Sequence, residues 1–433
     1  EIAQTMKIGI IIARIGGIDG VALETEKWIE VLERMGHETY VVAGQFEKRK
    51  INSERERRIP ELSLFSPESY WGQKKAFFAP DADAGEIMEH YELYGNVIKD
   101  KLLAWVQEHG IELIISENAS ALPIHISLGI GIKKLLEQTG MPAITHDHDF
   151  AWERGNRYRS PHHEINWLID DTFPLRLPNN YHAVINTAAQ KTLKERYNRE
   201  SIVVPNVMDF DKPFGQITPN NKNLKRELGL DENDILLFQI TRIVGRKAID
   251  VAIRLLDKLQ DERIKLVVTG GYVDDDGNKH YHELMDLIHD LGISQQVHFA
   301  YEKFSQGLHG DASSGIFSLS DAYAHARACT YFSTYEGFGN AFVESVLAKT
   351  PIFVNNYKPV FWPDIGSKGF RTVMLEDNKL TDDKVQQMKD VIYDDKLNRE
   401  IGEHNYELGK KYFSYQVLQN KLKKLLSEVK AES

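Results

Sequence analysis

The segment from Tyr335 to Pro351, YEGFGNAFVESVLAKTP, carries the densest set of residues that could do chemistry. It follows an apolar strand pattern, and it predicts a helix that begins at about Asn340. Two carboxylates, Glu336 and Glu344, lie eight positions apart, the first in the turn and the second inside the helix. The former can accept hydrogen bonds from sugar hydroxyls, and the latter can hold a vicinal diol such as a ribose.

The turn before this helix is suited to a negatively charged ligand. The backbone N–H groups of Phe338, Gly339 and Asn340 are expected at the helix N-terminus, where the helix dipole favours an anion. Gly337 and Gly339 let a ligand approach the backbone closely. This combination predicts a nucleotide-sugar site. The alternative is an ordinary strand-to-helix turn whose glycines serve packing.

A second group of charged residues lies in the segment TRIVGRKAIDVAI, which contains Arg242 and Lys247. Both are expected on a loop between a strand and a helix. Arginine binds phosphate oxygens in a bidentate manner and lysine acts as a compact charge, so the pair suits a diphosphate. The alternative is a pair of solvated surface cations.

Together these motifs resemble the retaining glycosyltransferases of family 4. The hallmark of that family is an E-G-F-G context with two glutamates separated by seven residues, matched here by Glu336 and Glu344. The family's C-terminal domain also opens with a strand followed by Arg and, five residues on, Lys, matched by Arg242 and Lys247. Ala248 stands where the family usually has glycine, which puts the geometry of that turn in doubt.

The resemblance extends over most of the chain and is weaker before residue 200. RIGGIDGVALE, with Gly17, is similar to the glycine-rich loop after the family's first strand, and it lacks the complete G-x-G-x-x-G of dinucleotide-binding proteins. PNVMDFDKPF resembles the junction between the domains, without its usual glycine. FSYQVLQNKLKKLL resembles the closing helix, which returns to the N-terminal domain. The segments YEGFGNAFVE and THDHDFAWER are most similar to the branch of the family that makes compatible-solute glycosides such as mannosylglucosylglycerate.

The segment THDHDFAWERGNRYRSPHH, Thr145 to His163, should lie at the carboxyl edge of the N-terminal sheet. The family usually has a histidine here that supports charge at the anomeric carbon of the donor sugar. His146 is expected in that role, and His148 is the second candidate and a predicted acceptor-binding residue. A histidine that only caps the strand is the alternative.

The resemblance implies a role for each matched residue. His146 and Glu336 are expected in catalysis. Donor binding is expected from Gly17, Arg242, Lys247, Phe338, Gly339, Asn340 and Glu344.

A cationic strip follows the same strand. Arg154 and Arg157 are predicted to bind an acceptor that carries a carboxylate or phosphate, and the alternative is pairing of the strip's arginines with Glu153 and Glu164. The acids Asp147 and Asp149 form a D-x-D that binds Mg²⁺ in other transferases. Family 4 does not use this motif, so no metal ligand is assigned and no cofactor is required, although assistance by Mg²⁺ is left open.

The strand and helix patterns of the whole chain predict two doubly wound α/β halves. KIGIIIA, a glycine-rich turn, an amphipathic helix and HETYVVAG form a first βαβ unit, and the strand pattern restarts at ILLFQIT. We expect a GT-B fold: an N-terminal Rossmann-like acceptor domain over 6–205, a C-terminal Rossmann-like donor domain over 206–395, and returning helices over 396–433. The ligands are expected in a cleft between the domains. The polar segment 47–58 is predicted to be a mobile surface loop.

Composition narrows the classes of partner. The 433 residues are 42% hydrophobic and 27% charged, with a net charge of −11, which argues against a nucleic-acid surface. The single cysteine, Cys329, suits a reducing compartment, so a cytoplasmic location is expected. No apolar run is long enough to span a bilayer, and the first helix is acidic, which disfavours binding to anionic lipid. The oligomeric state is left open.

The family resemblance implies transfer of a hexose with retention, from a nucleoside-diphosphate sugar to a soluble small acceptor. GDP-mannose is the expected donor, with UDP- or ADP-glucose as alternatives. Front-face attack is expected, because no second carboxylate is placed as a nucleophile. The competing functions are a glycoside phosphorylase on the same scaffold, a dinucleotide oxidoreductase, and a sugar-nucleotide-binding protein without turnover.

Overall fold

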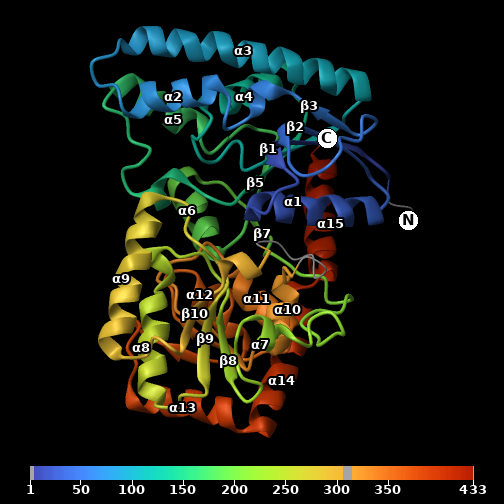
Figure 1. The fold of residues 1–433 in the computed structure, drawn as a ribbon. Coiled ribbons are helices and arrows are strands. Elements are labelled where there is room, and N and C mark those ends of the chain that lie inside the picture. The colour runs from blue at the N-terminus through green and yellow to red at the C-terminus, as the bar shows by residue number, and fades with distance from the viewer. Residues whose placement is uncertain (1–3, 306–314, 433) are drawn as a thin grey trace. The chain divides into compact units, whose positions relative to one another are not determined.

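The computed structural model describes residues 4–305 and 315–432. The chain forms two compact units (Figure 1). The first unit holds the residues up to Pro205 together with those from Tyr415 onward, and the second comprises Asn206–Ser414. Among the described residues, no helix has the length and apolar character needed to cross a membrane.

The first unit is built on a parallel sheet of seven strands, in the order β3-β2-β1-β4-β5-β6-β7. Its strands are β1 (Lys7–Ile15), β2 (Glu38–Phe46), β3 (Glu56–Arg58), β4 (Leu113–Glu117), β5 (Ala143–Asp147), β6 (Asn180–Val184) and β7 (Ile202–Val203). Its helices are α1 (Gly20–Arg34), α2 (Pro67–Phe77), α3 (Ala84–His109), α4 (Ile126–Thr139), α5 (His163–Thr172), α6 (Thr187–Tyr197) and α15 (Tyr415–Ala431), with short 3₁₀ turns at Pro60–Leu62 and Ala151–Arg154.

Helices cover both faces of this sheet. Gly9 and Ile11 of β1 face the long helix α3, and a Cβ atom at Gly9 would meet the Trp105 ring at 2.7 Å. The strands are nearly continuous apolar runs because both faces are buried, as in other parallel sheets. Helix α15 packs on α1 and β6, and Tyr181 of β6 donates a hydrogen bond to Glu432.

Two expectations about the first unit need correction. The segment 47–58, expected to be a loop, contains β3, which pairs with β2 at the sheet edge. The returning segment, expected from residue 396, is α15 alone. The residues before it form α14 (Asp395–Phe413), which belongs to the second unit.

The second unit repeats the same topology with six parallel strands, in the order β10-β9-β8-β11-β12-β13. The strands are β8 (Ile235–Gln239), β9 (Ile264–Val268), β10 (Val297–Phe299), β11 (Ala328–Tyr331), β12 (Ile352–Asn355) and β13 (Val373–Leu375). The helices, besides α14, are α7 (Leu224–Glu227), α8 (Ile249–Leu259), α9 (Asp275–Leu291), α10 (Leu319–His325), α11 (Asn340–Leu347), α12 (Phe361–Asp364) and α13 (Asp382–Tyr393), with 3₁₀ turns at Gly245–Lys247, Tyr301–Lys303 and Gly366–Lys368.

One apolar cluster holds α8, α9 and α13 against a face of this sheet, through residues such as Leu256, Ile288 and Met388. Helix α14 packs on α11 and α13. The order of the strands reverses at the first strand of each sheet, so that successive strands are added on one side of β1 and then, from β4, on the other, and likewise on the two sides of β8 from β11. Ligands of doubly wound folds bind at the carboxyl edge beside such a switch point.

Candidate active site

The predicted donor residues of the second unit meet at the carboxyl ends of β8 and β11, its topological switch point. The loop after β8 carries Arg242 and Lys247, and the loop after β11 carries Glu336. Buried Gln239 ties the two strand ends together, since its side chain donates to Thr241 (2.8 Å) and accepts from Thr330 (2.7 Å). Residues predicted from separate motifs are thus brought to one place by the strand order.

Glu336 is the centre of this group. Its Oε1 atom forms an ion pair with Lys247, lies 3.4 Å from Arg246 and accepts a hydrogen bond from Ser333 (2.8 Å). The side chains of Glu336 and Lys247 are each 12% exposed. Burial alone would raise the pKa of Glu336, but Lys247 and Arg246 outweigh it and hold that pKa below its usual value. The carboxylate is therefore ionised at neutral pH.

Backbone contacts fix the two loops to each other. Arg246 donates to the carbonyl of Tyr335 (3.1 Å), and its own carbonyl accepts from the N–H of Thr334 (2.8 Å). Arg242 is exposed, and its charge contributes to the field at Lys247. Lys247 and Arg246 thus contact one carboxylate, and Arg242 adds a third positive charge to the group. This arrangement suits a diphosphate beside a group that accepts hydrogen bonds.

Helix α11 begins at Asn340, as the sequence predicts, with Gly339 as its N-cap. Gly339 has φ = 143°, and a Cβ atom there would lie 2.3 Å from the hydroxyl oxygen of Tyr357. That hydroxyl donates to the carbonyl of Phe338, so the turn is held by a buried tyrosine. The glycine is required by backbone conformation and by space, and close approach of a ligand is not needed to explain it.

The remaining predicted donor residues lie on α11. Glu344 accepts a hydrogen bond from the buried Tyr323 hydroxyl at 3.0 Å. Asn340 is exposed and accepts from the side chain of Asn206 at 2.9 Å. The junction segment PNVMDF thus contacts the first residue of α11, a link between two sequence motifs that are 134 residues apart.

In the first unit, the glycine-rich loop after β1 lies at the corresponding switch point. Gly16 has φ = 92°, and Gly17 is buried against Glu47, whose carboxylate a Cβ atom at Gly17 would meet at 2.4 Å. Arg14 lies 3.4 Å from Asp19, the N-cap of α1, and 3.9 Å from Glu47. The loop backbone is therefore packed on Glu47, the residue that follows β2, and this contact explains why residue 17 is glycine.

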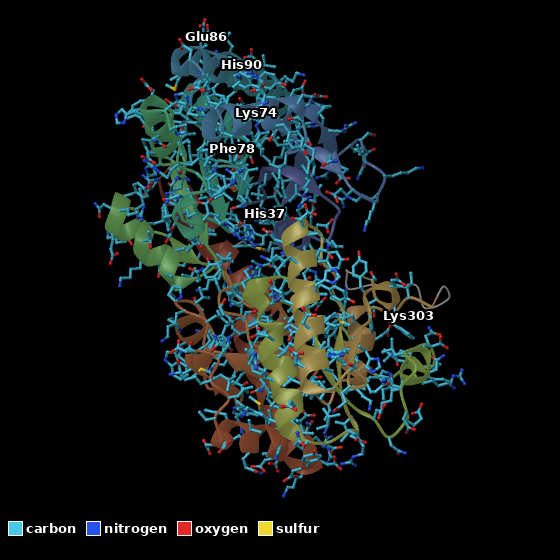
Figure 2. The ribbon with its side chains drawn as sticks, turned by 60° about the vertical axis from the view of Figure 1, so that its left-hand side comes forward. His37, Lys74, Phe78, Glu86, His90 and Lys303 are labelled. Carbon is cyan, nitrogen blue, oxygen red and sulfur yellow. The ribbon has the colours of Figure 1, made fainter. Side chains whose placement is uncertain are left out.

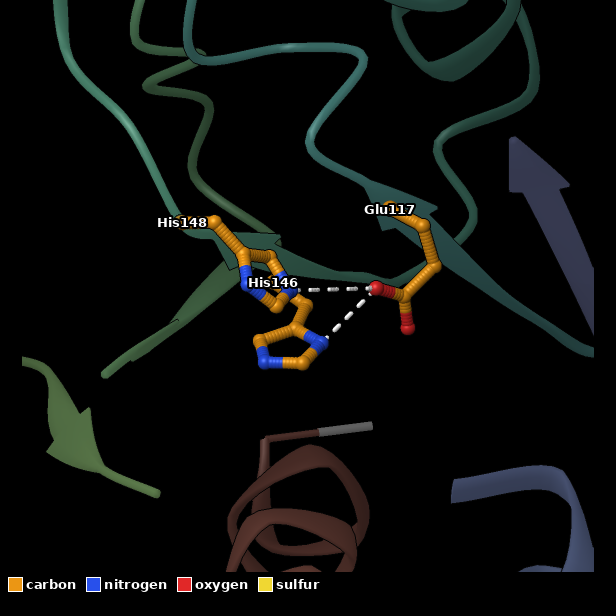
Figure 3. A group of neighbouring side chains, drawn as sticks. All are labelled: Glu117, His146 and His148. Carbon is orange, nitrogen blue, oxygen red and sulfur yellow. Dashed lines mark hydrogen bonds and ion pairs between the residues drawn. The ribbon is translucent and has the colours of Figure 1, made fainter. Parts of the chain in front are cut away.

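His146 and His148 lie together with Glu117, which ends β4 (Figure 3). His146 Nδ1 is 2.7 Å from Glu117 Oε2, and His148 Nε2 is 3.9 Å from the same oxygen. The ring of Trp28 on α1 stacks on His146 with centroids 3.9 Å apart. Burial alone would raise the pKa of Glu117, but the two imidazoles lower it to about 2.

Backbone contacts hold the loop that carries His148. Asn118, with φ = 57°, accepts from the backbone N–H groups of His148 (2.9 Å) and Asp149 (3.2 Å). The carbonyl of His146 accepts from the Asn118 N–H (2.9 Å). The imidazole of His146 is enclosed by Trp28, His148 and Glu117, so the interpretation as a simple strand cap does not describe it.

The acids of the D-x-D have different surroundings. Asp147 is buried and neither of its carboxylate oxygens has a hydrogen-bond partner, and burial raises its pKa to about 8. Asp149 pairs with Arg154 at 2.8 Å and with the Asn118 amide at 3.3 Å. Elsewhere in the chain, Asp274 caps α9, and Asp275 and Asp276 lie in its first turn.

The cationic strip does not form one cluster. Arg154 pairs with Asp149, and Arg159 with Asp170 at 3.3 Å. Arg157 donates to Gln73 at 2.8 Å and lies over the rings of Phe77, Phe78 and Tyr158. The pairing partners differ from Glu153 and Glu164, which the sequence suggested.

Four residues that contact Glu336 or His146 were not predicted from the sequence: Arg246, Ser333, Glu117 and Trp28. Arg246 directly precedes Lys247, so its place in the same basic loop was a usable signal. Glu117 ends the strand ELIISE, and an acid at the end of an apolar strand was a usable signal. Ser333 and Trp28 gave none, because their roles depend on strand order and on the docking of α1.

Comparisons with known proteins identify the family. The profile of the family described as "Glycosyl transferases group 1" matches residues 220–408. The mannosylglucosylglycerate synthase of Thermotoga maritima is 30% identical over 96% of this chain and 98% of its own length. The enzyme of the same name from Petrotoga mobilis is 30% identical over 86% of each chain.

Solved structures share the fold. A glycosyltransferase from Rickettsia africae superposes with a TM-score of 0.69 at 12% identity, covering 99% of this chain and 100% of its own. Anabaena HepE, solved with UDP and glucose, gives a TM-score of 0.64 at 15% identity, covering 98% and 99%. The two parallel Rossmann-like sheets are those of the GT-B fold. The chain belongs to the group 1 glycosyltransferases.

Proposed function

We propose that this enzyme transfers a hexose, with retention, from a nucleoside-diphosphate sugar to a small anionic acceptor. The donor is GDP-mannose and the acceptor is a glycerate glycoside. The observation that carries the proposal is the group of cations around Glu336 at the switch point of the second sheet. The two relatives that match most of the chain are both named for the synthesis of mannosylglucosylglycerate, which supports this choice of substrates.

The cations have the charge needed for the leaving group. As the bond to the anomeric carbon breaks, negative charge builds on the nucleoside diphosphate. Arg242, Lys247 and the N-terminus of α11 neutralise it, the electrostatic contribution that usually lowers such barriers most. This removes the need for Mg²⁺ at the diphosphate. Glu336, held ionised by Lys247 and Arg246, accepts hydrogen bonds from the donor sugar, and Glu344 holds the ribose diol.

The acceptor hydroxyl attacks from the face that the leaving group occupies, and the departing phosphate takes its proton. Gly17, His146 and His148 contribute from the first unit, with His148 on the acceptor side. Arg154 and Arg157 draw an anionic acceptor. The site has the charge for a phosphate ion too, so a phosphorylase is the second candidate.

A donor panel tests the proposal directly. Thermal-shift and calorimetric titrations would compare GDP, UDP and ADP with their mannose and glucose conjugates, since a ligand that binds only the folded chain stabilises it. Selective stabilisation by GDP and GDP-mannose is expected, followed by transfer to glucosylglycerate with an α-configured product by NMR. Selective response to UDP or ADP would overturn the donor assignment, and phosphate-dependent cleavage without nucleotide transfer would favour the phosphorylase.

A further inference from the structure

The transfer reaction proposed above gives roles to His146 and His148 but none to Glu117, which lies together with them. All three side chains are buried, with exposed fractions of 2%, 1% and 8%. Each offers one ligand atom, and the three atoms lie within 4.8 Å of one another. Within residues 4–305 and 315–432, these three side chains form the one group of at least three His, Cys, Asp or Glu residues whose ligand atoms lie so close together.

Hydrogen bonding does not satisfy the cluster. Only the contact between His146 Nδ1 and Glu117 Oε2, at 2.7 Å, is a hydrogen bond. The 3.9 Å from His148 Nε2 to that oxygen is too long for one. His148 Nε2, Glu117 Oε1 and His146 Nε2 are buried without a hydrogen-bond partner. Of these atoms, His148 Nε2 is one that faces the shared carboxylate oxygen. An unpaired buried polar atom is costly, so an ion that engages His148 Nε2 would be bound favourably.

We infer that Glu117, His146 and His148 bind a divalent transition-metal ion, Zn²⁺ or an ion of similar preference. Figure 3 shows both imidazoles presenting a nitrogen to the same carboxylate oxygen. Bonds of about 2.0–2.2 Å in a tetrahedral site place ligand atoms roughly 3.4 Å apart. The observed 2.7 Å and 3.9 Å lie on either side of that separation, so small side-chain rotations would admit the ion.

The ligand types select the class of metal. Two imidazoles and one carboxylate suit Zn²⁺, Co²⁺, Mn²⁺ or Fe²⁺, whereas Mg²⁺ and Ca²⁺ prefer sites made of oxygen atoms. Three protein ligands leave a coordination position for water or for an oxygen of a bound molecule. The cluster lies at the carboxyl edge of the first sheet, where ligands of such folds bind. This inference does not depend on the identity of the donor or acceptor.

The surrounding contacts support the ligands. Trp28 covers the ring of His146, which restricts its rotation. Asn118 holds the backbone of His148 through the N–H groups of residues 148 and 149. Buried Glu24, paired with Lys27, adds negative charge that acts on both histidines. Such outer contacts orient metal ligands and raise their affinity.

Titration of the metal-free full-length chain, without a histidine tag, with Co²⁺ tests the inference. One equivalent is expected to bind and to give visible d–d absorption bands typical of four or five ligands, and one equivalent of Zn²⁺ should abolish them. X-ray absorption of the Zn²⁺ form should show two imidazoles at about 2.0–2.1 Å. Absence of a saturable one-equivalent site would overturn the inference.

Two variants identify the ligands. His148→Gln and Glu117→Gln should each weaken Co²⁺ binding by on the order of tenfold or more, because even outer contacts of metal ligands have effects of that size. His90→Gln is the matched control. His90, on α3 and labelled in Figure 2, pairs with Glu68 at 2.7 Å, and none of the residues that the structure describes adds a third ligand there.

Circular dichroism and thermal unfolding of each variant establish that it is folded. A folded His148→Gln variant that binds Co²⁺ as tightly as the wild type would overturn the site. Equal weakening by His90→Gln would assign the binding to surface histidines and would overturn it as well.

Discussion

Lys247 and Glu336, 89 residues apart in the chain, form a buried ion pair at the carboxyl edge of the second sheet. Arg246 adds a second cation to the same carboxylate oxygen. Breaking a buried pair leaves an uncompensated charge, so the pair is sensitive to replacement of either member. It also holds the two loops in register before any ligand binds.

The two halves of this pair should affect nucleotide binding in opposite directions. Lys247→Ala removes a charge-assisted contact and should weaken binding of the nucleoside diphosphate by about tenfold or more. Glu336→Gln removes a competitor for the cations and should retain or strengthen that binding, while sugar transfer falls by roughly 10²–10³-fold. Calorimetry and initial rates measure the two effects.

Lys265→Ala is the control for both variants. Lys265 lies 3.7 Å from Asp234 and is similarly buried, but it lies on β9 away from the loops after β8 and β11. Nucleotide affinity close to the wild type is expected. Transfer near wild-type rates in both Lys247→Ala and Glu336→Gln would contradict the assigned site.

Gly339→Ala should disrupt the start of α11. Gly339 has φ = 143°, and the new methyl group would lie 2.3 Å from the Tyr357 hydroxyl oxygen. We expect a loss of about 1–3 kcal/mol in the free energy of unfolding and a weaker response to nucleoside diphosphates. Denaturant unfolding and thermal shift measure these.

The matched control is Gly245→Ala. Gly245 lies in the basic loop, has no positive φ and has no neighbouring heavy atom within 4 Å of the added carbon. A change in unfolding free energy within about 0.5 kcal/mol is expected. Equal destabilisation by the two variants would show that any side chain added near the site is harmful, and that the conformation of Gly339 is not special.

Arg157→Glu should raise the KM for an anionic acceptor and leave the KM for the donor unchanged. Three aromatic rings and Gln73 hold this guanidinium in place. Arg159→Glu is the control, because Arg159 lies only two positions from Arg157, is exposed and pairs with Asp170. Equal effects would point to the net charge of the strip, and an unchanged acceptor KM in Arg157→Glu would exclude acceptor binding there.

Acid should destabilise the first unit through His125. Burial lowers the pKa of His125 to about 4, and its Nε2 contacts the carbonyl of Glu61 at 2.7 Å. The unfolded chain therefore binds a proton between about pH 6.5 and 4 that the folded chain does not. The contribution is complete above pH 6.5, and it is lost at about 1.4 kcal/mol per pH unit as the pH falls through that window.

The His125→Gln variant tests this account. Its unfolding free energy should depend less on pH between 6.5 and 4 than that of the wild type, whatever its stability at pH 7. His182, whose pKa burial lowers to about 3, contributes a similar dependence that remains in the variant. Parallel pH profiles for variant and wild type would contradict the prediction.

The sequence alone determined the class of fold and the places of the local motifs after their strands. Near-continuous apolar strands alternating with amphipathic helices specify parallel sheets, because such strands must be buried on both faces. The E-G-F-G turn and the Arg242–Lys247 spacing are local patterns, so their positions after strands could be predicted. The start of α11 at Asn340 is confirmed.

The short edge strand β3 was not predicted from the sequence. The triplet ERR of β3 has no apolar periodicity, and only pairing with β2 makes it a strand. The boundary of the returning segment was wrong for a related reason. Helices α14 and α15 are both amphipathic, and only their packing partners assign the first to the second unit and the second to the first.

Tertiary structure decided which side chains meet. Strand order brings Lys247 to Glu336 and Glu117 to His146, since the carboxyl ends of neighbouring parallel strands converge at one edge. Tertiary packing also places the rings of Phe77 and Phe78, about 80 residues earlier in the chain, beside Arg157. A linear pattern encodes burial and local conformation, whereas contacts between distant residues depend on the order and register of the strands, which no single segment contains.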